Sequence, residues 1–154
     1  MSLKENREGY ELLDSGNGRK LERFGKVILV RPASQAIWEP VLPAEVWSRA
    51  DASFAREHGN RWSGRSRLPG HWIINESGLG FNLSTTDFGH LGIFPEQRAQ
   101  WHWIRQQVRA RKAHSGKSPP VLNLFAYSGG STLAAAQAGA ITCHLDASRG
   151  MVQW

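Results

Sequence analysis

The sequence predicts an α/β fold, in which a β-rich N-terminal lobe precedes the beginning of a parallel sheet. Two apolar runs near the C-terminus, residues 121–125 and 141–145, are too short for helices and are typical of buried strands. Between them, the Ala-rich residues 131–139 predict a helix that ends at its glycine. Strand, turn, helix and strand in this order predict a βαβ unit with two parallel strands.

The N-terminal part of the chain predicts antiparallel strands. Residues 10–31 read as a meander of short strands, with a turn at residues 15–18 and a break at Gly25. Residues 71–75 and 80–84 flank a turn and predict a hairpin, with Trp72 and Ile74 on one face. We therefore expect a β-containing lobe over residues 1–84 and a second domain over residues 85–154. The lobe is either a packing module or an RNA-contacting surface.

Two more helices are expected from apolar residues at helical spacing. The first covers residues 43–57, begins near Pro43 and ends at His58-Gly59. The second begins at Pro95 and buries a stripe of Trp101, Ile104 and Val108. Its other faces are expected to carry the basic residues Arg98, Arg105, Arg109, Arg111 and Lys112.

Residues 56–67 concentrate arginines around one aromatic side chain. The segment holds Arg56, Arg61, Arg65 and Arg67, with Trp62 among them and Gly59 and Gly64 to loosen it. Arginines around an aromatic ring can bind phosphates and stack on a base. A solvated loop is the simpler interpretation and is favoured here.

Composition limits the classes of function. The chain has 154 residues, 40% of them hydrophobic, which allows one domain or a small domain plus part of another. No apolar run approaches the roughly 18 residues of a membrane span, and residues 1–10 do not resemble a signal peptide. A single cysteine excludes an internal disulfide framework and favours a cytoplasmic location. The net charge of +6 favours an acidic partner such as RNA.

The turn between the two C-terminal strands has the chemistry of a ligand site. The start of a helix leaves N–H groups unpaired and attracts polar or anionic groups, and Gly129 and Gly130 allow close approach of the backbone. Asp146 follows the second strand and should reach the same edge of the sheet, where a carboxylate can accept both ribose hydroxyls. The Gly-x-Gly-x-x-Gly pattern is absent, which favours an adenosine ligand without phosphates over NAD.

These motifs resemble a known family. Residues 122–130, Leu-Asn-Leu-Phe-Ala-Tyr-Ser-Gly-Gly, and residues 144–148, His-Leu-Asp-Ala-Ser, resemble the first two motifs of class I S-adenosylmethionine-dependent methyltransferases. The branch most similar to them is related to the large-subunit ribosomal RNA cytosine-C5 enzymes, in which Thr usually stands at the position of Ser128. Residues 90–97 resemble the stretch upstream of the first motif. Residues 10–16 and 20–25 are similar to the start of one subgroup.

The resemblance implies S-adenosylmethionine as the cofactor and RNA, in particular ribosomal cytosine C5, as the methyl acceptor. It implies that Ser148 lies beside the adenosine. Phe125 and Tyr127 are expected to contact the methionine end of the cofactor, and the alternative for Phe125 is a place in the core. Ser128 and Ser131 are expected to be N-cap or turn residues, and either hydroxyl could reach the cofactor carboxylate. The predicted cofactor-binding residues are Phe125, Tyr127, Ser128, Gly129, Gly130, Asp146, Ser148 and Gln97.

No catalytic residue and no metal site are identified. The related cytosine-C5 enzymes attack the base with a cysteine after a later Asn/Asp-Pro-Pro motif, which this sequence does not contain. Cys143 lies within an apolar strand and is predicted to be a small buried residue. The six histidines are scattered without the spacing of metal ligands.

We therefore expect an N-terminal portion of a longer enzyme, or a truncated relative, with weak or no turnover by itself. Two other classes stay open: a non-catalytic RNA-binding module and a nicotinamide-dependent enzyme with a similar sheet. Steep salt dependence without a response to the cofactor would favour the first class, and binding of NADH would favour the second. The sequence does not indicate the oligomeric state.

Overall fold

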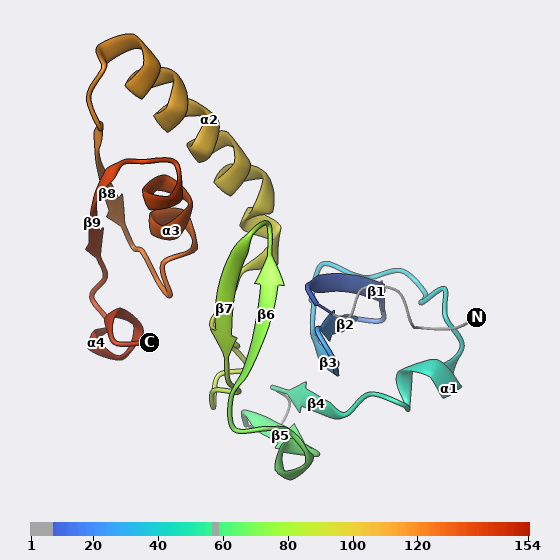
Figure 1. Cartoon of the computed structure of the whole chain (residues 1–154). Helices are drawn as coiled ribbons and strands as arrows, with labels where there is room; N and C mark the ends of the chain where they lie inside the picture. The colour runs from blue at the N-terminus through green and yellow to red at the C-terminus, as the bar shows by residue number, and fades with distance from the viewer. Residues whose placement is uncertain (1–7, 57–58) are drawn as a thin grey trace. The chain divides into compact units, whose positions relative to one another are not determined.

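The computed structural model describes residues 8–56 and 59–154 (Figure 1). The chain divides into two compact units. The first contains the described residues up to 75 together with residues 80–91, and the second contains residues 76–79 and 92–154. None of the described helices is long and apolar enough to cross a membrane.

The first unit is built on a five-stranded sheet in the order β1-β2-β3-β4-β5. Its strands are β1 (Tyr10–Gly16), β2 (Arg19–Phe24), β3 (Val27–Pro32), β4 (Ala52–Ala55) and β5 (Arg61–Ser63). The first three form the predicted antiparallel meander, and the β4 strand then pairs in parallel with β3. Helix α1 (Ala44–Trp47) lies in the connection and packs Trp47 on Leu21 and Val30.

The helix predicted over residues 43–57 is wrong beyond its first turn. Helix α1 has four residues, and the segment that follows turns into strand β4. Ala52 pairs with Leu29 of β3, and Phe54 stands opposite Trp62 of β5, so the sheet buries Phe54 in place of a helix. Tertiary pairing overrides a weak helical periodicity of this kind. The expected end of the helix at residues 57–58 lies outside the described residues.

The arginine-rich segment, where it is described, is not the loose loop we predicted. It contains β5 and a short 3₁₀ helix, η1 (Arg65–Arg67). The Trp62 indole donates to the Thr86 carbonyl at 2.8 Å and its ring contacts Phe54 at 5.1 Å between centroids. Arg65 binds the Asp87 carboxylate at 2.6 Å. Trp62 therefore serves packing, and is not free to stack on a base.

Strands β6 (Trp72–Glu76) and β7 (Leu79–Leu83) form the predicted hairpin as a separate two-stranded sheet. Ile74 on β6 and Phe81 and Leu83 on β7 are buried, because alternate side chains of a strand point to the same face.

The second unit is an α/β arrangement around two parallel strands. Short helix η2 (Pro95–Gln97) leads into α2 (Arg98–Ser115), which ends at Gly116 in the left-handed conformation. Strand β8 (Pro120–Leu124), helix α3 (Gly130–Gln137) and strand β9 (Ile141–Leu145) then form the predicted βαβ unit, followed by α4 (Arg149–Val152). Strands β8 and β9 pair in parallel from their first to their last residues. The predicted fold class is confirmed.

Helices α2 and α3 pack on one face of this sheet, where Val108, Ala135 and Ala138 form a core with Val121 (Figure 1). The stripe predicted for α2 is confirmed at Trp101 and Val108. Arg105 was expected on an outer face, and this is wrong. Its guanidinium is buried because it donates to the Gln137 side chain at 2.7 Å and to the Ser77 carbonyl at 2.6 Å.

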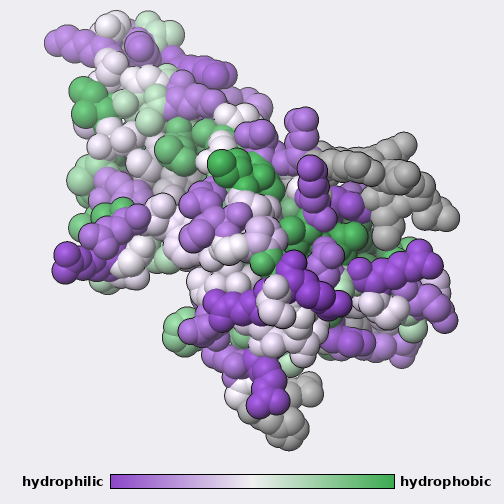
Figure 2. Space-filling model, turned by 60° about the horizontal axis from the view of Figure 1, so that its bottom comes forward, coloured by the Kyte–Doolittle hydropathy of each residue, from purple (hydrophilic) through white to green (hydrophobic). Residues whose placement is uncertain are grey.

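The other face of β8 and β9 is exposed. Its side chains are Leu122, Leu124, Ile141, Cys143 and Leu145. The prediction that Cys143 is buried is therefore wrong, because no described element covers the face of β9 to which it belongs. In Figure 2, hydrophobic residues likewise reach the surface in several places between hydrophilic ones.

Candidate cofactor site

The carboxyl ends of β8 and β9 bring the glycine turn and the acidic residue together. Parallel strands end at the same edge of a sheet, so the loop of residues 125–129 and Asp146 emerge side by side. The backbone N–H of Tyr127 donates to Asp146 Oδ2 at 2.8 Å, and that of Ser148 donates to Oδ1 at 2.8 Å. The proximity predicted from their spacing in the sequence is confirmed.

The Asp146 carboxylate is held in place by hydrogen bonds and still has unoccupied lone pairs. The N–H groups of Ser148 and then Tyr127 lower the pKa of Asp146 below its usual value, and the nearby His144 acts in the same direction. The carboxyl is therefore ionised at neutral pH. An ionised carboxylate offers about four lone-pair positions, and the two backbone amides occupy one on each oxygen. The remaining positions can accept hydroxyl groups from a ligand.

The loop backbone adopts a conformation that its residues do not favour. Phe125 has φ of 56° and Tyr127 has φ of 52°, both in the left-handed region. This region costs a residue with a Cβ roughly 1–2 kcal/mol, and such conformations cluster at functional sites. Phe125 is 90% exposed, so burial of its ring does not explain the conformation. The loop thus presents an aromatic ring to solvent, two residues before the Tyr127 N–H that binds Asp146.

A second segment fastens the loop. The Gly92 N–H donates to the Tyr127 hydroxyl at 3.0 Å, and the Ser128 hydroxyl donates to the Gly92 carbonyl at 2.5 Å. The Phe94 ring packs on the Tyr127 ring with centroids 4.5 Å apart. Residues 90–97 were singled out by resemblance, and the structure shows that Gly92 and Phe94 fix the shape of the glycine turn.

The start of helix α3 differs from the expected cap. Gly129, with φ of 95°, is the N-cap and supplies no side chain, so neither Ser128 nor Ser131 is the N-cap. Ser128 is a turn residue, which is the other of its two predicted roles, and Ser131 lies inside the helix. The first N–H groups of an α-helix lack acceptors within the helix, and this end therefore attracts a carboxylate or another anion. These groups face the same edge of the sheet as Asp146, because α3 begins directly after the loop.

Glycine stands at positions 129 and 130 for different physical reasons. A Cβ on Gly130 would lie 2.8 Å from the Trp101 ring, so this glycine permits α3 to pack against α2. A Cβ on Gly129 would lie 3.3 Å from the His144 ring, and its backbone is in the left-handed region. Packing therefore explains Gly130 better than the approach of a ligand.

A polar network beneath the loop was missed by the sequence reasoning. The Asn123 amide donates to the Thr132 hydroxyl at 2.9 Å, and this hydroxyl lies 3.0 Å from His144 Nδ1. The network joins β8, α3 and β9 directly below the ligand edge. Asn123 and His144 are polar residues at paired positions of two mostly apolar strands, a signal that could have revealed the network.

The two remaining candidates differ in their relation to Asp146, because the Ser148 backbone binds this carboxylate and Gln97 does not. Ser148 is the N-cap of α4, where its hydroxyl accepts from the Met151 N–H at 3.4 Å. Gln97 is exposed at the end of η2, and among the described residues no hydrogen bond joins its side chain to the loop. No group of three metal-ligating side chains occurs in the described part of the chain.

The fold is that of class I S-adenosylmethionine-dependent methyltransferases. A SAM-dependent methyltransferase from Agrobacterium tumefaciens is 40% identical, with a TM-score of 0.85, over 94% of this chain and 46% of that chain. A structure from Streptococcus mutans, described as a putative SAM-dependent methyltransferase, has a TM-score of 0.65 over 97% of this chain and 42% of that chain. At 19% identity, the second likeness shows the fold alone.

Two curated relatives are ribosomal RNA large subunit methyltransferases K/L. The protein from Magnetococcus marinus is 32% identical over 83 residues, and the one from Marinobacter nauticus is 30% identical over 101 residues. These matches cover 53% and 64% of this chain, but only 10% and 13% of the relatives. No family model matches the chain. The chain is thus a relative of these enzymes that spans about a tenth of the curated proteins and under half of the Agrobacterium chain.

Proposed function

We propose that this chain binds S-adenosylmethionine at the β8–β9 edge and provides the cofactor site of a methyltransferase that acts on RNA. The proposal rests on the state of Asp146. Its carboxylate is ionised and half-buried, and each of its two oxygens accepts one hydrogen bond from a backbone N–H. Its neighbours are a strained loop and the start of α3. The Agrobacterium relative, 40% identical across this region, is named for dependence on this cofactor.

Each group at the edge has a role in binding. Asp146 accepts the two ribose hydroxyls, and the first N–H groups of α3 receive the carboxylate of the methionine part. Phe125 and Tyr127 wall the ligand, with Tyr127 held by Asp146 and Gly92. When bound, the cofactor supplies an electrophilic methyl group on a sulfonium. The contribution of the chain is to fix the orientation of that group toward an acceptor.

RNA is the acceptor that the observations favour. The curated relatives are named for large-subunit ribosomal RNA, and the chain carries a net charge of +6. Cytosine C5 as the acceptor atom is supported by the motif resemblance alone. Incubation with S-adenosylmethionine and unmodified large-subunit ribosomal RNA, followed by mass spectrometry of the nucleosides, tests it. 5-Methylcytidine would support C5 as the acceptor atom. A different methylated nucleoside would refute C5 but would still support methyltransferase activity.

Calorimetric titration with S-adenosylhomocysteine tests the cofactor site without requiring turnover. Asp146→Asn should weaken binding by about 10- to 100-fold, because one ionic acceptor is replaced by an amide of the same size. Glu45→Gln, an exposed residue of α1, is the matched control and should bind as the wild type does. Absence of binding to the wild type, or equal binding by Asp146→Asn, would refute the proposal. Binding of NADH in its place would favour a nicotinamide enzyme.

A further inference from the structure

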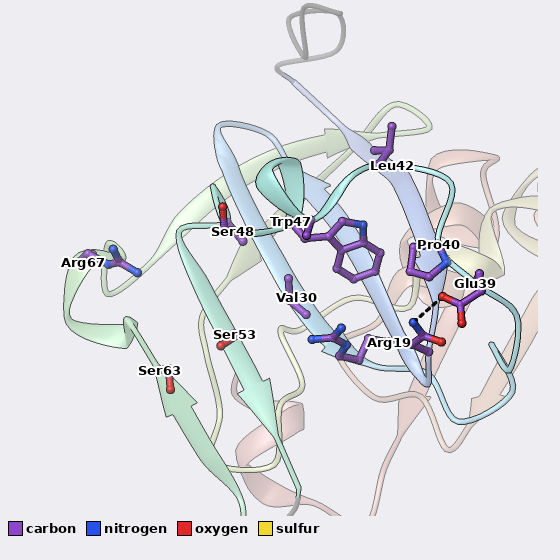
Figure 3. A pocket seen from close by; sticks show the side chains of 13 residues that line it. Arg19, Val30, Glu39, Pro40, Leu42, Trp47, Ser48, Ser53, Ser63 and Arg67 are labelled. Carbon is purple, nitrogen blue, oxygen red and sulfur yellow. Dashed lines mark hydrogen bonds between the residues drawn. The ribbon is translucent and has the colours of Figure 1, made fainter.

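The first unit contains a cavity of ≈ 640 Å³ beside helix α1 (Figure 3). Its volume lies within the roughly 300–1,000 Å³ typical of small-molecule sites. The lining comes from strands β2 to β5, from η1 and from the segment around α1. The lining residues that matter here are Arg19, Arg67, Trp47, Glu39, Ser53 and Ser63.

The cavity exists because one row of the sheet changes from apolar to polar. Leu21 pairs with Val30, Val30 with Ser53, and Ser53 with Ser63, so the four side chains share a face. Trp47 covers the apolar end of the row by packing on Leu21 and Val30. The two serines continue the row beyond this cover. Strands favour β-branched and aromatic residues, so hydroxyls here offer hydrogen bonds in place of packing surface.

Two arginines give the cavity a positive charge. In Figure 3 the Arg19 side chain lies beside Val30, and the Arg67 side chain lies on η1, on the other side of Ser53. Among the described residues neither has an ion pair, whereas three other arginines of the first unit are paired. Those three are Arg23, with Glu11; Arg31, with Glu22; and Arg65, with Asp87. The acidic residue of the lining, Glu39, accepts a hydrogen bond from the Asn17 amide at 3.0 Å.

Contacts with neighbouring residues hold both guanidinium groups in place. The Arg19 guanidinium lies 5.5 Å from the centroid of the Trp47 ring, a distance at which a cation and an aromatic ring attract. The Arg67 guanidinium lies over Gly64, where a Cβ would come within 2.5 Å of its Nη2. Glycine at this position, with φ of 81°, therefore makes room for Arg67.

The opposite wall is fixed by one carboxylate. Asp14 accepts hydrogen bonds from the Leu42 N–H at 2.8 Å and the Trp47 indole at 3.0 Å. A Cβ on Gly16 would lie 2.4 Å from the Pro40 nitrogen, so the segment that contains Pro40 lies directly on β1. A cavity with such walls is preformed, and a ligand loses little free energy in ordering it.

We propose that this cavity holds one nucleotide of a single-stranded RNA, with its phosphate between Arg19 and Arg67 and its sugar and base toward Ser53 and Ser63. A nucleotide supplies an anion, hydrogen-bonding groups and an apolar base face, which together match this lining. The carboxylate of an acidic side chain would match only the arginines. The inference rests on the proposed RNA acceptor and deepens it, since it assigns a place where the strand is held.

Fluorescence anisotropy with a labelled single-stranded RNA of 12 mixed nucleotides tests the inference on the full chain. The double variant Arg19→Gln/Arg67→Gln should bind at least about 10-fold more weakly. The control Lys26→Gln/Arg49→Gln removes the same charge from exposed residues outside the lining, and should change binding less than about 3-fold. The slope of log affinity against log salt should fall by about 0.7 for each RNA phosphate that is no longer neutralised, in the first variant only.

Two further measurements distinguish the possible explanations of a loss of RNA binding. Arg67→Gln alone should weaken RNA binding by about 3-fold or more, and it leaves the packing of Arg19 on Trp47 in place. Cytidine monophosphate should compete only at concentrations well above those of the RNA. Equal losses in both double variants, or tighter binding of the free nucleotide than of RNA, would overturn the inference. Titration of the double variant with S-adenosylhomocysteine reports on the cofactor site separately and should match the wild type.

Discussion

Two aspartates, one in each unit, use the same chemistry to different ends. Asp14 and Asp146 each accept backbone N–H groups from a segment distant in the sequence. Asp14 is buried and accepts from four donors: the N–H groups of Ser15, Val41 and Leu42 and the Trp47 indole. Asp146 is half-buried and accepts from two.

The difference separates a structural carboxylate from a binding carboxylate. The acceptor positions of Asp14 are filled from within the chain, so its role is to hold the segment around α1 against the sheet. Those of Asp146 are half filled at the end of two parallel strands, where ligands of such sheets bind. The number of lone pairs left over, rather than the residue type, indicates which acid meets a ligand.

The largest expected effect is on stability, from Asp14→Ala. Four donors lose their acceptor in a buried site, and we expect a loss of about 3 kcal/mol or more in the free energy of unfolding. Asp146→Ala should lose clearly less, because water can reach its donors. Urea denaturation followed by circular dichroism measures both. A larger loss of stability for Asp146→Ala than for Asp14→Ala would contradict this distinction between the two carboxylates.

Gly130→Ala tests whether the packing of α3 on α2 requires a glycine beside the site of Asp146. The new Cβ would meet the Trp101 ring at 2.8 Å, and the overpacking should cost about 1–3 kcal/mol despite the better helix propensity of alanine. Gly150→Ala in α4 is the control, because its Cβ would meet only the Ser148 hydroxyl, at 3.9 Å. Thermal unfolding distinguishes the two. Equal stability would show that Gly130 serves the ligand and not the helix packing.

Both carboxylates should contribute to the pH dependence of stability. Burial opposes ionisation of Asp14, but the hydrogen bonds from Leu42, Val41, Trp47 and Ser15 lower its pKa overall, and amide hydrogen bonds lower the pKa of Asp146 as well. A lowered pKa in the folded state gives stability that is present above the unfolded value of 3.8. This stability is lost as the pH falls through the folded value.

Asp14→Asn and Asp146→Asn should therefore each remove part of the loss of stability seen below about pH 4. Affinity for S-adenosylhomocysteine should stay constant from about pH 7 to pH 5, because Asp146 remains ionised there. Denaturation curves and titrations across this range measure both quantities. A steep fall of affinity between pH 7 and pH 5 would indicate that a different group controls binding.

The smallest effect is expected at Phe125, and it should have opposite signs in two measurements. Asparagine tolerates the left-handed conformation better than phenylalanine, so Phe125→Asn should gain about 0.5–1 kcal/mol of stability. Loss of the exposed ring should weaken S-adenosylhomocysteine binding by a few-fold, if Phe125 walls the ligand. Unchanged affinity would remove Phe125 from the site.

The sequence predicted the order of elements near the site and the approach of Asp146 to the glycine turn. Both follow from local patterns: short apolar runs, an Ala-rich helix and an acid after the second strand. The predicted cofactor agrees with the one for which the Agrobacterium relative is named. The assignment of individual residues to the cofactor stays a prediction.

What the sequence did not predict depends on partners distant along the chain. Arg105 is buried because Gln137 and Ser77 accept its guanidinium, and Ala52 forms a strand because Leu29 is beside it. Cys143 is exposed because no described element covers its face of β9. Strands of parallel sheets are apolar on both faces, so the sequence pattern does not reveal which face is covered. The left-handed backbone of Tyr127 depends on Gly92 and Asp146 together.

A crystal structure of the chain with S-adenosylhomocysteine tests the central claim most directly. The account predicts both ribose hydroxyls within about 2.5–3.0 Å of the Asp146 oxygens, with the two backbone N–H groups still bound to the same carboxylate. A ligand seated elsewhere, or an Asp146 side chain turned away from the sugar, would contradict it.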